Sequence, residues 1–452
     1  MRTICIFIRN HSPLLRSRGL AALLMIALLA SLEAGSGLVV ARPQPRSGVV
    51  PQANPIPLLA GMVQAVNAGA GDQTDPRVNC NLVTYADADT PGNNRVHYYD
   101  FSSGLDFATP GNGIDTQPAI AGKLIAFTEG DPTGSHIVLF DTATQFRTDL
   151  AGPAGSKAAL GGNLVAFEDR SFFVAPNMSE ISVYDQDTGV TTRLTNDQLF
   201  DKSVDVSPTG NVLVWEKCHT DGTACDIYSA VQTAPDVFTV SALVSSPGEE
   251  RDPHTNGQFV VYTSDRSGLI HVYFQPIGGG SETQIILSGN QRNPKISGNL
   301  IAFESEVGTE YHIFVYDITS GSLYQATNTP GTEFLGGITV CNGIARIVYG
   351  TSSADWDVYA FTFQIPNAAL SQINNLIALV RSFGLAPRIQ SSLIAPLQAA
   401  LNAIAVSDNA TACSSMTTFI NLVQAQGKKL TPAQASQLIS GANQIKATLG
   451  CP

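Results

Sequence analysis

Basic residues are scarce in this chain: 25 Lys and Arg stand against 37 Asp and Glu, so the formal net charge is −12. Nucleic-acid binding depends on cations that neutralise phosphates, so a chain this acidic is a poor nucleic-acid binder. Long apolar runs are lacking too. The main one, Gly19 to Leu32, holds 14 residues, whereas a membrane-spanning helix needs roughly 20. We expect neither a nucleic-acid partner nor a membrane span.

Two catalytic signatures that accompany β-rich hydrolases are also absent. The sequence has no Gly-x-Ser-x-Gly nucleophile elbow, and the tail is too short to hold the α/β domain that would carry one. It has no repeated Ser-x-Asp-x-Gly-x-Thr-Trp boxes of the kind that sialidases show. These absences favour a protein that binds over one that catalyses, and no cofactor is expected.

The N-terminus has the layout of a secretory signal peptide over residues 1–41. Four arginines precede the apolar run, and Val39 and Ala41 end a stretch of small residues. Cleavage near Ala41 would give a periplasmic or extracellular protein. Because the segment carries four arginines and Glu33, its removal changes the formal charge from −12 to −15. Six of the seven cysteines lie beyond it, an even number in a compartment that permits disulfides.

An internal repeat sets the fold. An apolar pair followed by an aromatic residue recurs seven times, at spacings of 40 to 48 residues. The aromatic residues are Tyr85, Phe127, Phe167, Trp215, Tyr262, Phe303 and Tyr349. A period of ~40 to 50 residues built from short strands is typical of propeller blades. Because each aromatic sits in an apolar strand, we interpret the series as packing between blades and not as a ligand cage.

Each repeat continues with a second alternating strand, a turn such as Asp185 to Gly189, and a third strand. The next repeat opens with a short segment that often contains proline, as at Asp75-Pro76 and Asp252-Pro253. Such a unit is a four-stranded antiparallel sheet that cannot bury both faces alone, so several must stack around an axis. The sequence predicts a mainly β protein, a seven-bladed β-propeller with six blades as the alternative, followed by a small α-helical bundle.

The fourth and fifth repeats resemble those of TolB-like propellers. Ser207-Pro208-Thr209-Gly210 stands before an apolar strand, and Tyr262 to Gly268 matches that family's TSDRSG-like turn. The resemblance covers about residues 74 to 364 and implies the propeller fold. TolB itself is six-bladed and carries an α/β domain, whereas this sequence has seven repeats and no such domain, so its role in the Tol complex does not transfer.

Residues 366–452 differ from the rest in charge and aromatic content and contain apolar residues at helical spacing, which predicts three or four helices. The last begins at Thr431-Pro432, an N-cap followed by proline. The run from Phe419 to Ala425, with Leu430-Thr431 and Leu438-Ile439, is similar to the FIMAH-type helical module and implies an accessory or interaction role; an unrelated bundle is the alternative. The predicted domains are 42–73 closing the propeller, 74–365 the propeller, and 366–452 the helical domain.

The axial channel is the candidate ligand site, since the repeat openers should supply the innermost strand of each blade. The predicted mouth residues are Asp75, Arg77, Gln117, Lys157, Lys202, Asp252, His254, Asn293 and Lys295. Their mixed donors and acceptors suit a peptide, a glycan or a small polar ligand. The alternative is that these groups only solvate a water-filled channel.

Metal sites are weakly indicated. His136 and His312 occupy equivalent places in different repeats, and His97 and His271 fall close to that place, so repetition explains them without a shared metal. One loop with Asp87, Asp89 and Asn93 offers oxygen ligands for Ca²⁺, but loop solvation is the simpler explanation. No metal site is predicted.

The function expected from these observations is that of an exported, non-enzymatic binding protein whose propeller recognises a protein, a peptide or a cell-envelope polymer. The alternative is a carbohydrate-active lyase or hydrolase with its site in the axial channel. Convergence of His254, Arg77 and Lys295 with a metal or a perturbed acid in the channel would favour the enzyme. A third possibility is a purely structural surface protein.

The chain ends should close the ring, because the seventh repeat lacks an outer strand and Pro57 to Val66 is apolar. Three disulfides follow from the positions of the cysteines: Cys80–Cys341, Cys218–Cys225 and Cys413–Cys451. The first pair occupies equivalent places in repeats one and seven, which are neighbours only in a closed seven-bladed ring. A bridge there would stabilise the fold by roughly 4 to 5 kcal/mol.

Overall fold

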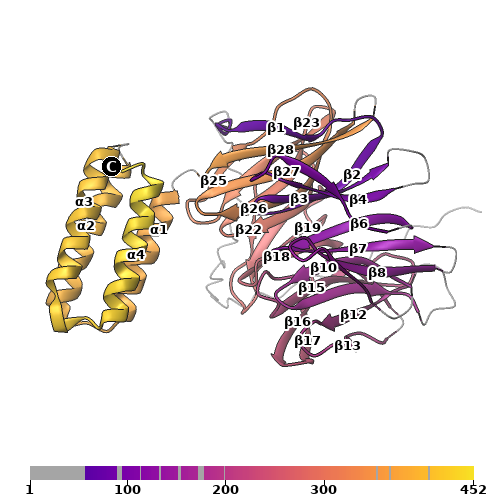
Figure 1. Cartoon of the computed structure of the whole chain (residues 1–452), viewed down its shortest axis with the longest axis horizontal. Coiled ribbons are helices and arrows are strands. Elements are labelled where there is room, and N and C mark those ends of the chain that lie inside the picture. Colours follow the sequence, from indigo (N-terminus) through magenta and orange to yellow (C-terminus); the bar gives the residue numbers. More distant parts are fainter. Residues whose placement is uncertain are drawn as a thin grey trace, which may run out of the picture. The chain divides into compact units, whose positions relative to one another are not determined.

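The computed structural model describes residues 56–88, 94–111, 113–131, 134–150, 154–171, 178–197, 199–352, 355–365, 368–405 and 408–451. Seven four-stranded antiparallel sheets form the blades of a propeller, and helices follow them in the chain (Figure 1). The seven-bladed prediction is confirmed, and the six-bladed alternative is wrong. Among the described residues, no helix is long and apolar enough to cross a membrane. The predicted signal peptide lies outside the described residues.

The strands have the following bounds. Blades one and two contain β2 (Asp72–Asn79), β3 (Leu82–Ala88), β4 (Arg95–Asp100), β5 (Leu105–Ala108), β6 (Ile114–Ala121), β7 (Leu124–Asp131), β8 (Gly134–Asp141) and β9 (Phe146–Asp149). Blades three and four contain β10 (Gly155–Gly161), β11 (Leu164–Asp169), β12 (Glu180–Asp185), β13 (Val190–Arg193), β14 (Phe200–Val206), β15 (Val212–Cys218), β16 (Asp226–Ala234) and β17 (Val237–Val244). Blades five and six contain β18 (Glu250–Thr255), β19 (Phe259–Ser264), β20 (His271–Pro276), β21 (Thr283–Gln284), β22 (Gln291–Ser297), β23 (Leu300–Val307), β24 (Glu310–Asp317) and β25 (Ser322–Gln325). Blade seven contains β26 (Glu333–Cys341), β27 (Ile344–Ser352), β28 (Trp356–Gln364) and β1 (Met62–Asn67).

The seven repeated aromatic residues are buried, each in the second strand of its blade. Their apolar surroundings extend from one blade to the next: Trp215 of blade four shares a cluster with Leu164 and Ile181 of blade three. Burial of apolar area between blades stabilises the ring by ~25 cal/mol per Å². The core therefore lies between the sheets, as the spacing of the repeat predicts.

Strand β1 closes the ring. It pairs antiparallel with β28 and so supplies the outer strand of blade seven from the other end of the chain. On the inner side, Gly336 of β26 lies against the backbone of Pro76 in β2, where an added Cβ would stand only 2.2 Å from the Pro76 carbonyl oxygen. Glycine is thus required where blades seven and one approach most closely.

A disulfide joins the same two blades. Cys80, after β2, is bonded to Cys341 at the end of β26, with the two Cα atoms 5.5 Å apart and a sequence separation of 261. The Cys80 amide also donates to the Thr339 hydroxyl at 3.1 Å. This bridge confirms the predicted pairing of the first and seventh repeats.

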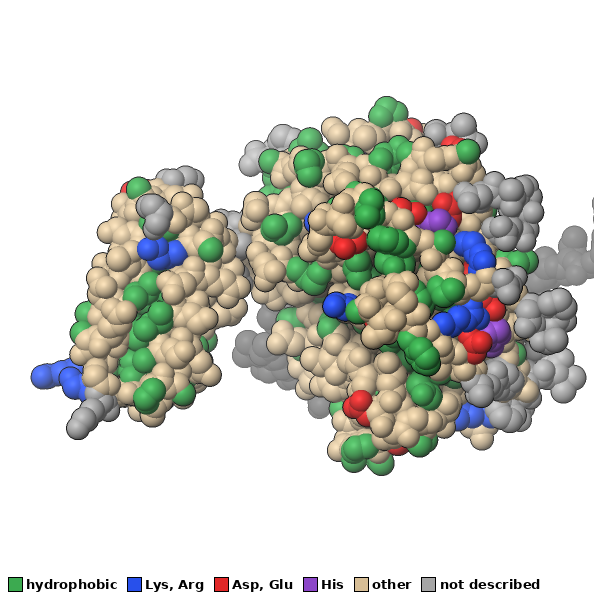
Figure 2. Space-filling model, in the orientation of Figure 1, with side chains coloured by type: hydrophobic (Ala, Val, Ile, Leu, Met, Phe, Trp, Pro, Cys, Tyr) green, Lys and Arg blue, Asp and Glu red, His purple; other side chains and the backbone are tan. Residues whose placement is uncertain are grey.

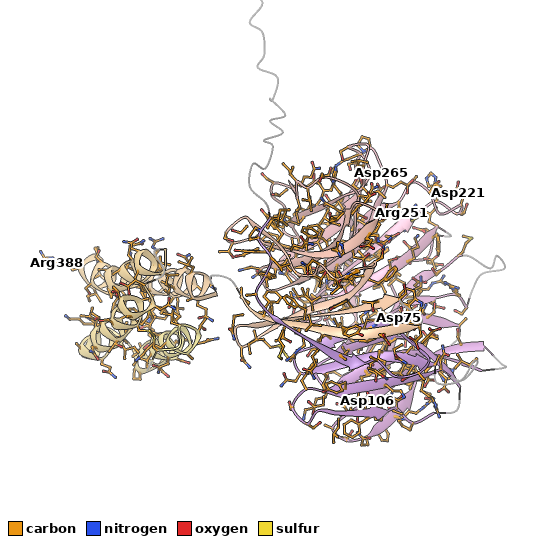
Figure 3. The ribbon with its side chains drawn as sticks, turned by 90° about the horizontal axis from the view of Figure 1, so that it is seen from above. Asp75, Asp106, Asp221, Arg251, Asp265 and Arg388 are labelled. Atoms are coloured by element: carbon orange, nitrogen blue, oxygen red, sulfur yellow. A yellow bond between two sulfur atoms is a disulfide. The ribbon has the colours of Figure 1, made fainter. Side chains whose placement is uncertain are left out.

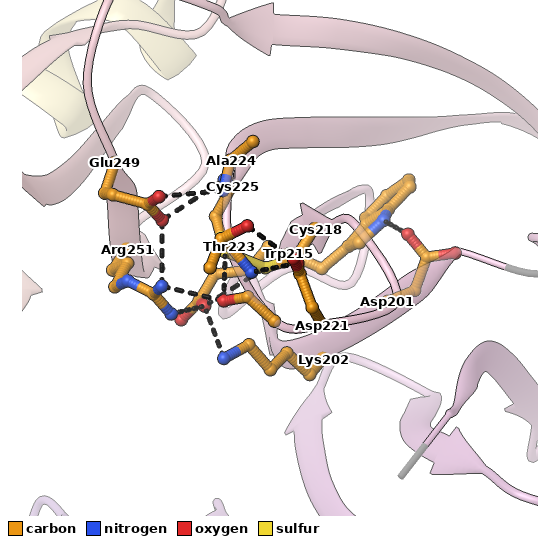
Figure 4. Close-up of a disulfide and its surroundings, with 12 residues drawn as sticks. Asp201, Lys202, Trp215, Cys218, Asp221, Thr223, Ala224, Cys225, Glu249 and Arg251 are labelled. Atoms are coloured by element: carbon orange, nitrogen blue, oxygen red, sulfur yellow. Dashed lines mark hydrogen bonds and ion pairs between the residues drawn. A yellow bond between two sulfur atoms is a disulfide. The ribbon is translucent and has the colours of Figure 1, made fainter. Parts of the chain in front are cut away.

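The second disulfide, Cys218–Cys225, lies at the boundary of blades four and five (Figure 4). Next to it, the Glu249 carboxylate accepts hydrogen bonds from the amides of Ala224 and Cys225, at 2.7 and 3.3 Å, and from the Arg251 guanidinium at 2.8 Å. These bonds tie the loop that carries the disulfide to the first residues of blade five. The bridge is local, as predicted.

Buried polar side chains connect successive inner strands. The residue after the repeated aromatic accepts a backbone hydrogen bond from the inner strand of the next blade: Glu168 from Ser203 at 3.0 Å, Glu216 from Asp252 at 2.9 Å, and Glu304 from Leu335 at 2.7 Å. All three glutamates are almost fully buried. Because each also pairs with a cation, burial does not leave the charge uncompensated.

The C-terminal helices are α1 (Ala368–Ser382), α2 (Pro387–Ala405), α3 (Asn409–Ala425) and α4 (Pro432–Thr448), with a 3₁₀ turn over Gly427–Lys429. Their apolar faces share one core, which includes Leu397, Met416 and Phe419. The predicted cap at Thr431 is confirmed, since its hydroxyl accepts from the Gln434 amide and Gln434 bonds back to complete a capping box. The third predicted disulfide, Cys413–Cys451, joins α3 to the residues after α4.

Candidate functional site

The first strand of every blade contributes to a cavity of about 460 Å³ at the centre of the ring. Each inner strand pairs with the strand of its own blade that carries the repeated aromatic. In each inner strand we consider the residue that lies opposite the position just before that aromatic. These seven equivalent residues are Arg77, Ala119, Ala159, Asp205, His254, Lys295 and Gly337. All seven line the cavity, and we call them the channel layer.

A β-bulge stands two residues before the channel layer in six blades. The residue there has a left-handed backbone, with φ between 49° and 54°. These residues are Asp75, Gln117, Lys157, Ser203, Asp252 and Asn293. The ladder register shifts at each one, and the bulge re-aims the side chains that follow. Repetition around the ring shows that the conformation belongs to the architecture of the blade.

Seven of the nine predicted mouth residues line the cavity. They are Asp75, Arg77, Gln117, Lys157, Asp252, His254 and Lys295. Asp75, labelled in Figure 3, lies among the propeller strands, whereas Asp221 and Asp265 lie in loops. A ligand-binding role for these seven residues stays a prediction.

The other two predicted residues, Lys202 and Asn293, lie outside the lining. Lys202 stands one residue before the blade-four bulge at Ser203 and directly opposite Glu216 in the ladder, and its ammonium lies 3.2 Å from the Glu216 carboxylate. The Asn293 amide donates instead to Glu304 at 2.9 Å and to the Leu335 carbonyl at 2.6 Å, so it is engaged between blades six and seven.

Asp205 is the channel residue that the sequence analysis missed. It stands two residues after the bulge at Ser203, the offset that also separates Arg77 from Asp75 and Lys295 from Asn293. No proline marks the opener of blade four, so the offset was hidden. The channel residue stands eight residues before the repeated aromatic in five blades but ten before Trp215 in blade four, so a fixed count along the sequence would also have missed it.

Asp205 and His254 face each other across neighbouring blades. One Asp205 carboxylate oxygen lies 3.6 Å from His254 Nδ1 and accepts the Thr255 amide at 2.8 Å. Burial raises the pKa of Asp205 to about 6, against the hydrogen bond from Thr255 and the positive charges of Lys295 and Arg77. A carboxyl that titrates near neutral pH can take up and release a proton during turnover.

His254 is held in its neutral form. Burial, together with the charges of Lys295 and Arg77, lowers its pKa well below the ordinary value. Its Nδ1 accepts the Ile296 amide at 3.2 Å, so the ring proton resides on Nε2. The imidazole can therefore donate one hydrogen bond from Nε2.

Arg77 and Lys295 complete the polar side of the channel layer. Burial lowers the pKa of each, and the positive charge of Arg77 lowers that of Lys295 further, while Asp205 opposes both shifts. The Arg77 guanidinium donates to the carbonyls of Pro76 and Gly336, at 2.9 and 3.4 Å. In the described part of the chain, neither cation has a carboxylate within 4.0 Å.

The raised pKa of Asp205 predicts a pH-dependent stability. The folded protein binds this proton up to pH about 6, whereas the unfolded chain loses it near 3.8. Ionisation of Asp205 therefore destabilises the folded state. The free energy of unfolding falls as pH rises through 6, by at most about 3 kcal/mol in all. Asp205→Asn should gain stability relative to the wild type between pH 4.5 and 7.5 in urea unfolding. An unchanged difference at the two pH values would contradict this assignment.

The histidines of the third blade strands, β4, β8 and β24, lie in separate blades. His97 is 2.7 Å from Asp106, His136 is 3.9 Å from Glu129, and His312 is 3.3 Å from Glu333. On the face shown in Figure 2, histidine side chains lie beside acidic and basic ones on the propeller. In the loop with Asp87, both Asp89 and Asn93 lie outside the described residues.

The comparisons with known proteins find the fold but no family. No family model and no curated protein matches the sequence. Among solved structures, the acylaminoacyl peptidase of Pyrococcus horikoshii is 14% identical with a TM-score of 0.51, over 68% of this chain and 54% of that chain. A puromycin-hydrolyzing peptidase of Mycobacterium tuberculosis is 13% identical with a TM-score of 0.51, over 66% and 53%. A puromycin hydrolase is 15% identical with the same TM-score, over 65% and 52%.

These similarities establish a β-propeller, and this chain spans about half the length of each of the three structures. They also contradict the expectation of a non-enzymatic binding protein, since the solved proteins that share this propeller are peptidases and a hydrolase. The expectation was wrong because it rested on the absence of two catalytic sequence motifs. Acid and base groups on strands far apart in the sequence form no linear motif.

Proposed function

We propose that this protein is a hydrolase whose acid–base centre is the polar half of the channel layer. The observation that carries the proposal is the convergence of Asp205, His254, Lys295 and Arg77 at equivalent positions of four inner strands. Such convergence with a perturbed acid was the criterion that favours an enzyme over a binding protein. The perturbed acid is Asp205.

The chemistry assigned to these residues is hydrolysis without a covalent intermediate. The Asp205 carboxylate takes a proton from water while the water oxygen bonds to the substrate carbonyl carbon. His254 Nε2–H donates to the oxygen that becomes negative. As the tetrahedral intermediate collapses, the bond from carbon to the leaving nitrogen breaks and Asp205 returns its proton to the amine. No serine nucleophile is invoked, in accord with the absence of a Gly-x-Ser-x-Gly elbow.

A peptide is the substrate that we propose first. The similar solved structures are named as peptidases, and a channel lined by mixed polar groups suits a polar chain. Polysaccharides are the competing class, because the alternative drawn from the sequence was a carbohydrate-active enzyme with its site in the same channel.

The test compares wild type with Asp205→Asn on a peptide library read by mass spectrometry. General acid–base groups contribute ~10² to 10⁴-fold, so Asp205→Asn should lower kcat/KM at least ~10²-fold.

The kcat/KM of the wild type should rise as pH passes about 6, because Asp205 then ionises. The charged and titratable groups that line the channel with it are Arg77, Lys295, His254, Asp75 and Asp252. Asp187→Asn, in the exposed turn after β12, is the matched control and should keep full activity. Cleavage that survives in Asp205→Asn, or cleavage of polysaccharides alone, would overturn the proposal.

We further infer that the protein is exported, with a signal peptide over 1–41, a TolB-like propeller over 74–365 closed by 42–73, and a FIMAH-like module over 366–452. Three disulfides support a periplasmic or extracellular location, since they persist in oxidising compartments. The resemblance of Ser207 to Gly210 and of Phe419 to Ala425 to those families supports the two domain assignments. N-terminal sequencing of the secreted protein tests the cleavage site.

A further inference from the structure

The channel layer has a gap between its two cations. Arg77 lies in blade one and Lys295 in blade six, and blade seven, which stands between them, presents Gly337 at the equivalent position. Its neighbour Gly336 likewise has no side chain, and both glycines line the cavity. Gly336 is packed against Pro76, so it is the missing side chain at Gly337 that leaves blade seven without a polar group between the two cations, and we call this position the gap.

Both cations are arranged to receive an anion. Both side chains are half-buried in the channel wall and line the cavity, so a negatively charged group that enters can contact them. The Arg77 guanidinium is already positioned by its bonds to the Pro76 and Gly336 carbonyls, at 2.9 and 3.4 Å. A guanidinium held in this way can bind a carboxylate through two parallel hydrogen bonds.

The acidic groups nearby leave the gap available. Asp205 is engaged by the Thr255 amide at 2.8 Å and lies beside His254. Asp75 and Asp252 are exposed at the bulges, two residues before the layer. Within the described ranges, none of the three comes within 4.0 Å of Arg77 or Lys295. Asp75, Asp205, Asp252 and Glu304 therefore act on these two cations only from beyond 4.0 Å, and an incoming carboxylate can approach them more closely.

We propose that Arg77 and Lys295, on either side of Gly337, bind the terminal carboxylate of a peptide, so that the enzyme acts at the C-terminal end of its substrate. This inference rests on the proposed function and deepens it. The carboxylate occupies the gap in blade seven, and the peptide chain runs from there past Lys295 toward His254 and Asp205. The order of blades one, seven, six, five and four around the ring provides that path.

The test measures binding apart from hydrolysis, by calorimetry on Asp205→Asn with trialanine as the free acid and as its C-terminal amide. The free acid should bind at least ~10-fold more tightly than the amide, and Arg77→Gln or Lys295→Gln in the same background should remove most of that preference. Gly337→Asp should abolish binding, because its carboxylate would occupy the gap. Gly337→Ala is the matched control for folding, since its Cβ would meet only Val78 at 3.5 Å, an ordinary contact.

Equal binding of the acid and the amide, or a preference that survives in Arg77→Gln and Lys295→Gln, would overturn this inference and leave the hydrolase proposal intact. Binding of galacturonate but not of trialanine would overturn it in favour of an acidic sugar. The converse result is also distinguishable: if the acid binds as expected but the wild type cleaves no peptide, the hydrolase proposal fails and the carboxylate site stands.

Discussion

Replacing Cys80 and Cys341 together by serine is expected to lower the free energy of unfolding by about 5 kcal/mol. The bridge closes a loop of 261 residues, and in the chain-entropy model its stabilisation grows with the logarithm of loop length. A loss this large is comparable to the total stability of many domains. Urea unfolding under non-reducing conditions measures it, and limited proteolysis should cut the variant faster because blades one and seven can separate.

The Cys218–Cys225 bridge provides the matched control for this loss. It closes a loop of only 7 residues, so its replacement by serine should cost about 3 kcal/mol less than loss of the long-range bridge. The hydrolysis proposed above should persist at low temperature in both variants, since none of the four sulfurs lies in the channel layer. Equal losses of stability for the two pairs would show that ring closure does not depend on the Cys80–Cys341 bond.

The fold could be predicted from the sequence because its signal is repeated. Seven apolar strands, each with an aromatic residue at the same place, indicate the same packing seven times, so an error in one repeat is corrected by the others. The same logic paired Cys80 with Cys341, because residues at equivalent places in the first and last blades meet when the ring closes. The outer strand β1 followed from the unpaired edge that blade seven would otherwise expose.

The candidate site was predicted less completely. Proline marks the bulge in blades one and five, which led to Arg77 and His254, whereas blade four opens with Ser203-Val204 and gives no such mark. Lys202 was chosen in place of Asp205 for that reason. The raised pKa of Asp205 depends on burial among residues of blades one, five and six, and no local sequence pattern carries that information.

The function could not be read from the repeat at all. A propeller fold hosts many activities, so recognition of Ser207 to Gly210 as a TolB-like turn says nothing about chemistry. In this propeller, the side chains of the channel layer are the candidates for that chemistry. Here three of the seven positions are small, Ala119, Ala159 and Gly337, and the other four carry acid, base and two cations.

Replacing Glu304 by alanine is expected to destabilise the propeller by about 3 to 5 kcal/mol. The buried carboxylate accepts the Leu335 amide at 2.7 Å and the Asn293 amide group at 2.9 Å, and it pairs with Arg292 at 2.6 Å. Removal leaves the donors of Leu335 and Asn293 without this charged acceptor, at about 1.5 to 3 kcal/mol for each bond, and leaves the partly exposed Arg292 guanidinium without its carboxylate. Because Leu335 belongs to blade seven, the loss should appear as weakened docking of that blade.

Glu304→Gln separates the hydrogen bond from the charge. The amide oxygen can still accept from Leu335, so this variant should lose less stability than Glu304→Ala. Glu310→Ala is the control for removing an acid from the same blade: its side chain is 42% exposed and its loss should change stability by no more than about 0.5 kcal/mol. Hydrogen exchange should report faster opening of β26 in Glu304→Ala alone. If Glu304→Ala and Glu310→Ala unfold at the same urea concentration, the buried glutamates do not hold neighbouring blades together.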